Sequence, residues 1–179
     1  HTYDPGAFAF EAQFDEERFD TLLGSNETQA VEFQLYMEDD ISLGALKANI
    51  GVHASGFVVD GTFYHSIQPR IGLRYLLGND WALKASFATM AQYINLLTNE
   101  SLSLPTDLWV PSTARIKPQT SWQPAIGVAK TLWDEFEFSV EGYYKHMNNV
   151  ISYKEGISFL GLENDWQDKV TQGKGESYG

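Results

Sequence analysis

Hydrophobic and polar residues alternate one by one along several stretches of the chain. One set of side chains, Val31, Phe33, Leu35 and Met37, is interleaved with a second set, Glu32, Gln34, Tyr36 and Glu38. The same period of two recurs at residues 46–53, 70–77, 81–87 and 136–145. Because successive side chains of a strand point to opposite faces, each stretch predicts a β-strand with one apolar and one polar face.

Weaker alternation predicts further strands at Ala7–Phe14 and Gln123–Lys130, and another that begins near Val170. The total is about seven or eight strands. No long amphipathic helix is predicted. Gln92–Leu97 is expected to form a short helical turn inside a loop.

The connections between these strands differ in length. Tight turns are predicted at Asp39–Leu43, Gly78–Asp80 and Trp133–Glu135. Longer connections are predicted at Asp15–Glu27, Ser55–Ser66, Ala91–Thr120 and Asn148–Lys169. Short and long connections thus alternate, which in an up-and-down meander places every short turn at one end. Outer-membrane barrels have this asymmetry, whereas the Greek-key connections of soluble sandwiches mix lengths at both ends.

Aromatic residues flank the predicted tight turns. Trp81 and Trp133 adjoin two of these turns, with Tyr75 and Phe136 close by. Aromatic side chains collect at membrane interfaces, where Trp and Tyr keep an apolar ring in contact with lipid and a polar group in contact with water. We therefore predict that these residues are membrane-interface aromatics at one rim of a barrel.

Composition narrows the function classes. The formal net charge is −12, which argues against nucleic acid as a partner and against a polybasic membrane-surface helix. The absence of cysteine excludes disulfides and thiolate metal sites. No stretch reaches the roughly 20 apolar residues of a membrane helix. The pattern favours an all-β, antiparallel, up-and-down transmembrane β-barrel, with outer-membrane lipid as a partner.

Several motifs resemble the barrel of TonB-dependent receptors. The stretch from Gln68 to Leu77, followed by Trp81 to Phe87, is similar to a strand pair of that family. Further similar segments are Ser103–Pro111, Ile116–Gln119, Phe138–Tyr144 and Gly173–Gly179. Their order and spacing extend the resemblance over roughly residues 33–179.

The resemblance implies an outer-membrane receptor of a Gram-negative bacterium that takes up a scarce ligand with energy passed on by TonB. It also implies a barrel of about 22 strands with an N-terminal plug. We expect residues 1–179 to be part of one such barrel domain, roughly a third of it, in an internal or processed piece of a longer protein. No plug sequence is found in the chain, so contact with TonB is expected through a missing plug region. The imported ligand is not identified by the sequence.

Catalytic and metal sites are not predicted, nor is a cofactor. The histidines lack zinc-motif spacing, no G-x-S-x-G elbow is present, and Glu137 and Glu141 are about 13 Å apart on one strand face. Ligand contacts are instead predicted in the long loop of residues 91–120, which offers aromatic and polar side chains. The candidates are Tyr93, Asn95, Asn99, Trp109 and Arg115. They suit a sugar or a flat chelate, but packing within the loop is the better-supported explanation of their presence.

Two other interpretations remain open. A soluble glycan-binding β-sandwich requires Val31, Phe33, Leu35 and Met37 to pack inside, with Glu32 and its neighbours in water. A passive outer-membrane porin differs from an active transporter only through the family resemblance. An outer-membrane barrel enzyme would need a nucleophile and a base on one rim, and no such set is found in the sequence.

Overall fold

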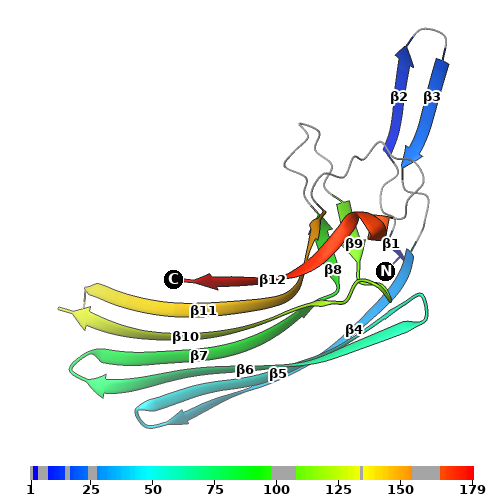
Figure 1. Ribbon diagram of the computed structural model, residues 1–179. Coiled ribbons are helices and arrows are strands. Elements are labelled where there is room, and N and C mark those ends of the chain that lie inside the picture. The colour runs from blue at the N-terminus through cyan, green and yellow to red at the C-terminus, as the bar shows by residue number, and fades with distance from the viewer. Residues whose placement is uncertain are drawn as a thin grey trace.

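The computed structural model describes residues 2–3, 8–14, 17–23, 28–97, 108–133, 135–154 and 166–179, with side chains from residue 29 onward except residue 108. The described residues form antiparallel strands and one 3-10 helix, η1 (Trp166–Lys169). The main sheet has eight strands in the order β1-β4-β5-β6-β7-β10-β11-β12. Their bounds are Thr2–Tyr3, Thr28–Leu43, Leu46–Val59, Thr62–Gly78, Trp81–Gln92, Gln119–Leu132, Phe136–Tyr153 and Val170–Tyr178. The predicted antiparallel, up-and-down β fold is confirmed, as a curved open sheet rather than a closed barrel (Figure 1).

The turn between β4 and β5 lies at Gly44 and Ala45, and Gly44 has a φ of 59°. The turn predicted at Asp39–Leu43 is therefore wrong, because those residues continue strand β4. Two aspartates suggested a turn, but a partner on the next strand offsets their polarity. Asn49 donates its side-chain N–H to Asp40 Oδ1 at 2.8 Å.

The connection between β5 and β6 is a two-residue hairpin turn at Asp60 and Gly61, with φ values of 44° and 75°. The long connection predicted at Ser55–Ser66 is wrong, and so is the strict alternation of loop lengths. Positive φ at both central residues favours the Asp-Gly pair in such turns. That dipeptide was the sequence signal for this hairpin.

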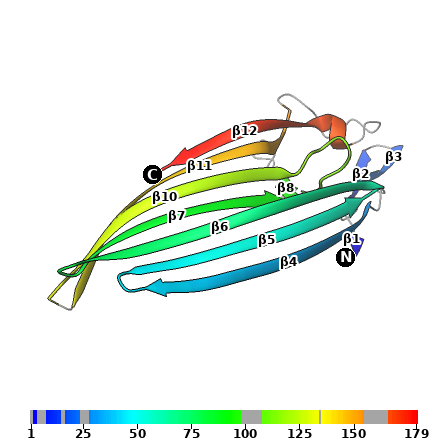
Figure 2. The ribbon, with the colours of Figure 1, turned by 90° about the horizontal axis from the view of Figure 1, so that it is seen from below.

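The turns predicted at Gly78–Asp80 and Trp133–Glu135 are confirmed. Asn79 and Asp80 both have positive φ, and Trp133 lies between β10 and β11 with a φ of 53°. These two turns and the β4–β5 turn lie at the same end of the meander (Figures 1 and 2). This short-turn end is also tied together laterally, because Thr131 donates its backbone N–H to the Asp80 carbonyl at 3.0 Å.

The opposite end of the sheet, the loop end, carries extra elements. Residues 8–14 form β2 (Phe8–Phe14), which pairs with β3 (Glu17–Leu23) as a separate hairpin (Figure 1). The prediction of residues 7–14 as a barrel strand is therefore wrong, and the short β1 occupies that place beside β4. The helical turn predicted at residues 92–97 is also wrong, because β8 (Ile94–Leu97) pairs with β9 (Leu108–Pro111). The strand predicted to begin near Val170 is confirmed as β12.

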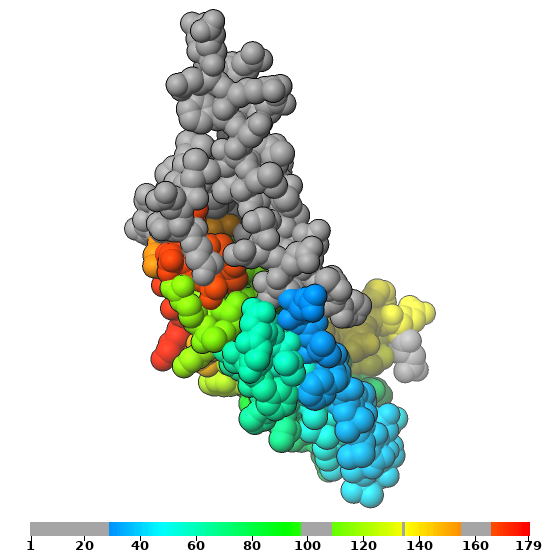
Figure 3. All heavy atoms as spheres, turned by 90° about the vertical axis from the view of Figure 1, so that its right-hand side faces the viewer, coloured from blue at the N-terminus to red at the C-terminus, as the bar shows by residue number. Residues whose placement is uncertain are grey.

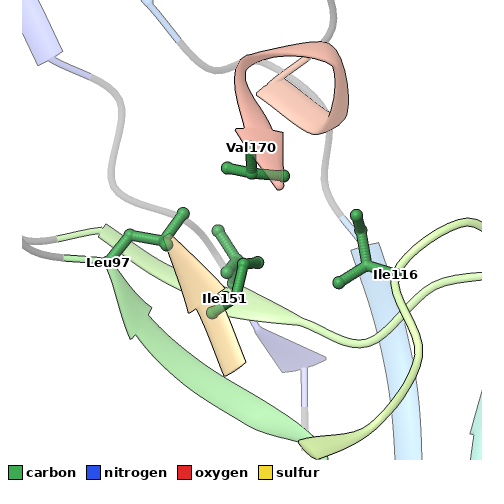
Figure 4. Close-up of a cluster of buried hydrophobic side chains, with 5 residues drawn as sticks. Leu97, Ile116, Ile151 and Val170 are labelled. Carbon is green, nitrogen blue, oxygen red and sulfur yellow. The ribbon is translucent and has the colours of Figure 1, made fainter. Parts of the chain in front are cut away.

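Buried apolar side chains gather at the loop end. One cluster joins Leu97, Val110 and Ile116 to Ile151 of β11 and Val170 of β12 (Figure 4). Elsewhere the described strands form a single curved layer, in which β4, β5 and β6 lie side by side (Figure 3). Strands β8 and β9 are therefore held against the loop end, while most of the sheet has two open faces.

Candidate functional site

The apolar face is the side of the sheet on which the alternating hydrophobic residues lie. Its exposed members include Val31, Phe33, Leu35, Met37, Ile50, Ile67, Ile71, Leu73, Ile126, Phe138 and Val140. Leu35 is 73% exposed and Val140 is 74% exposed. An exposed apolar surface that extends over many strands marks a contact with lipid or with another protein.

The four predicted interface aromatics, Tyr75, Trp81, Trp133 and Phe136, are exposed and lie close to the short turns. The Lys130 ammonium lies 4.8 Å from the Trp81 ring centroid. It also donates to the Asn79 carbonyl at 2.9 Å. This lysine thus lays its stem along apolar surface and directs its charge toward the rim, as lysines at membrane interfaces do.

A second aromatic group ends the apolar face on the opposite side, toward the loop end. Trp122 of β10 contacts Tyr144 of β11, with ring centroids 5.4 Å apart. Polar groups follow at once, because His146 Nδ1 lies 3.5 Å from Glu176 Oε1. The sequence analysis missed this group, since only the strand register places Trp122 opposite His146.

The polar face is the other side of the same strands and carries a hollow of about 560 Å³ near the short-turn end. Residues from β4, β5, β6, β7, β10 and β11 line it, among them Asp40, Lys47, Arg74, Lys84 and Glu141. A single hollow that spans so many neighbouring strands shows that the sheet curves around its polar face. On this face, Lys84 and Glu137 form an ion pair across strands at 3.7 Å.

Tyr93, the first of the predicted ligand residues, anchors the β7–β10 connection to β5. Its ring stacks on Phe57, with centroids 4.9 Å apart and planes at 4°. Its hydroxyl lies 2.8 Å from Ser55 Oγ, and Gln68 donates to that same oxygen at 3.0 Å. Ser55 and Phe57 alternate with apolar-face residues, so this connection folds over the polar face at the loop end.

The other predicted ligand residues fall in different surroundings. Asn95 on β8 is 3% exposed, and neither of its amide atoms has a hydrogen-bond partner in the described part of the chain. Trp109 on β9 is exposed. Arg115 is exposed and forms an ion pair with Asp168 of η1. Asn99 lies outside the described residues. Asn95 and Trp109 thus lie on the paired strands β8 and β9, and Tyr93 directly precedes β8 in the chain. Arg115 is instead bound to η1.

Residues 3–179 match the family described as TonB dependent receptor-like, beta-barrel. The chain belongs to this family. No curated protein and no solved structure matches the chain. The TonB-dependent receptor barrel explains the two unlike faces, because lipid-facing and lumen-facing residues alternate along barrel strands. The short-turn end and the two aromatic groups fit the same architecture.

Among the described residues, no helix is long and apolar enough to cross a membrane. Within the same ranges, no group of three or more metal-ligating side chains lies close enough together to hold an ion. The family is one of transporters.

Proposed function

We propose that this chain is the lumen-forming wall of an outer-membrane receptor that takes up a ligand actively with energy from TonB. The observation that carries the proposal is the apolar face, which is open over several strands and bounded by aromatic residues at both ends. A closed barrel satisfies every backbone N–H and C=O internally, so such strands are stable in lipid.

The soluble glycan-binding sandwich is less well supported. It requires Val31, Phe33, Leu35 and Met37 to be buried, yet each is between 54% and 73% exposed. Family membership favours active uptake over passive diffusion through a porin. In the proposed orientation, the short-turn end faces the periplasm and the β8–β9 strand pair faces the outside, as the turns and loops of other outer-membrane barrels do.

The ligand is proposed to meet the β8–β9 strand pair first. Trp109 offers an exposed aromatic surface on β9. Tyr93 anchors the chain just before β8 rather than contacting ligand, because its ring and hydroxyl already contact Phe57 and Ser55 of β5. An aromatic platform held on a rigid strand is suited to a sugar or a flat chelate.

Fractionation of cells that express the full-length parent protein tests the location. We expect recovery in the outer membrane and a change of gel migration on boiling, as closed barrels show. Recovery in the soluble fraction would overturn the proposal.

A second experiment tests active uptake while the ligand is still unidentified. Solutes removed from the medium by the parent strain are compared by mass spectrometry with those removed by strains that lack the receptor or TonB. We expect both deletions to spare the same solute. If the solute spared by the receptor deletion is still removed by the strain that lacks TonB, the protein is instead a passive porin.

A further inference from the structure

Basic residues are concentrated on one face of three neighbouring strands. Strands β5 to β7 contain four Lys and Arg residues, namely Lys47, Arg70, Arg74 and Lys84, and no Asp or Glu. All four alternate with apolar-face residues and therefore lie on the polar face. The chain as a whole has a net charge of −12, so this local positive charge runs against its composition.

The strand register aligns three of these cations in one row. Lys47 of β5 is the cross-strand partner of Arg74 of β6, and Arg74 is the partner of Lys84 of β7. Directly opposite side chains have Cβ atoms about 4.5–5.5 Å apart, and like charges in that position repel each other. The row Lys47–Arg74–Lys84 is therefore unfavourable unless an anion neutralises it.

The described residues offer few carboxylates that could neutralise this row. Lys84 lies 3.7 Å from Glu137, whereas no described carboxylate lies within ion-pair distance of Lys47 or Arg74. Asp40 and Glu141 lie on β4 and β11, the two outermost strands that line the hollow. Asp40 already accepts a hydrogen bond from Asn49 at 2.8 Å. The centre of the row thus remains positively charged.

The same row borders the hollow of about 560 Å³. Small residues line the space between the charges, namely Gly72, Ser86, Ala125 and Gly127. A Cβ added at Gly72 would meet no atom closer than the Asn49 Cβ at 3.8 Å, so the space above Gly72 is open. Small-molecule sites commonly occupy about 300–1,000 Å³ and need only a few well-placed polar groups.

We propose that Lys47, Arg74 and Lys84 form an oxyanion-binding site on the lumen wall, which takes a carboxylate or phosphate group of the imported solute. This inference rests on the proposed function, because a solute reaches this face only if the barrel is a transport route. The planar guanidinium of Arg74 pairs with two oxygens at once, and the flanking lysines add compact charges. Rows of Arg and Lys select anions in other pores.

The experiment uses the full-length parent protein, purified in detergent and titrated calorimetrically with inorganic phosphate and with citrate. Arg74→Gln is expected to weaken binding by about tenfold, the loss of a charge-assisted hydrogen bond. Arg70→Gln is the matched control, since Arg70 shares the strand and the face but does not line the hollow. It should change the affinity less than about twofold.

A second variant leaves every charge in place. Gly72→Val fills the space between the cations and should also weaken binding by about tenfold if the solute group occupies it. Its control is Gly173→Val on β12, where an added Cβ meets no atom within 4 Å. Gly173→Val should leave the affinity unchanged.

The outcomes separate the possible sources of the oxyanion. If the unaltered protein shows no saturable binding, the solute site is overturned. If, in addition, Arg74→Gln lowers the thermal stability of the protein, carboxylates of the protein itself neutralise the row. Equal weakening by Arg70→Gln and Arg74→Gln indicates diffuse charge and overturns the site as well. Outer-membrane recovery of the same preparations distinguishes a failure of this site from a failure of the proposed function.

Discussion

Placing a charge on the apolar face is the most direct test of which side of the sheet meets lipid. Ile126 lies on β10 between Ala85 of β7 and Gly142 of β11, and it is 68% exposed although both neighbouring strands are present. It lies between the two aromatic boundaries, which places it in the lipid-facing belt. Ile126→Arg is therefore the perturbation of choice.

The expected magnitude has two parts. If the exposed 68% of this isoleucine faces lipid as proposed, removing the side chain loses about 1–2 kcal/mol of favourable transfer. An arginine near the bilayer midplane adds about 2–4 kcal/mol of unfavourable free energy. The free energy of unfolding should thus fall by about 3–6 kcal/mol. Ser139→Arg is the control, because Ser139 is exposed on the polar face of the adjacent strand and should change stability by less than about 1 kcal/mol.

Reversible urea unfolding of the full-length protein in phospholipid vesicles measures both values, with gel migration before and after boiling as a check on barrel closure. Equal effects of Ile126→Arg and Ser139→Arg would contradict the assignment of faces. A larger effect of Ser139→Arg would reverse it and favour a soluble fold with the apolar side inward.

Further predictions concern packing on each face. Tyr93→Ala should destabilise the docked connection by about 3–5 kcal/mol through loss of the ring stacked on Phe57, whereas Tyr93→Phe should cost only about 1 kcal/mol. Limited proteolysis of the β7–β10 connection measures the difference, and equal protection of both variants would refute the stacking argument. Gly56→Ala should destabilise the barrel by about 1–3 kcal/mol, because its Cβ would lie 2.3 Å from the Phe33 ring. Gly72→Ala, which has room, is its control in urea unfolding, and equal effects would show that the Phe33 ring gives way freely.

Local alternation was sufficient to predict most strands and their two faces. The stretch from Val31 to Glu38 became the middle of β4, with its hydrophobic side chains exposed together. Period two is a property of the extended backbone itself, so it survives whatever the strand pairs with. The same argument failed for residues 7–14, where the strand was right but its partner was wrong. Pairing depends on chain segments that local pattern does not identify.

Turn positions were predictable where the residues demand positive φ. Asn79 and Asp80 form the β6–β7 turn as predicted, and Asp60-Gly61 carried an equally clear signal that was overlooked. Asp39 and Asp40 misled, because a cross-strand partner allows a carboxylate to remain within a strand. Polarity alone therefore marks a turn less reliably than backbone conformation does.

Some features of the candidate site likewise follow from the sequence, and others follow only from the tertiary structure. The sequence by itself determined that the strands have one apolar and one polar face, because side-chain alternation requires only a locally extended backbone. It also determined the aromatic residues at the short turns and, through its motifs, the family. The tertiary structure decided the register, which sets Trp122 beside Tyr144 and aligns Lys47, Arg74 and Lys84. It also decided that Tyr93 packs on Phe57. These contacts join residues far apart in the chain, and their partners are fixed only when the whole sheet pairs and curves.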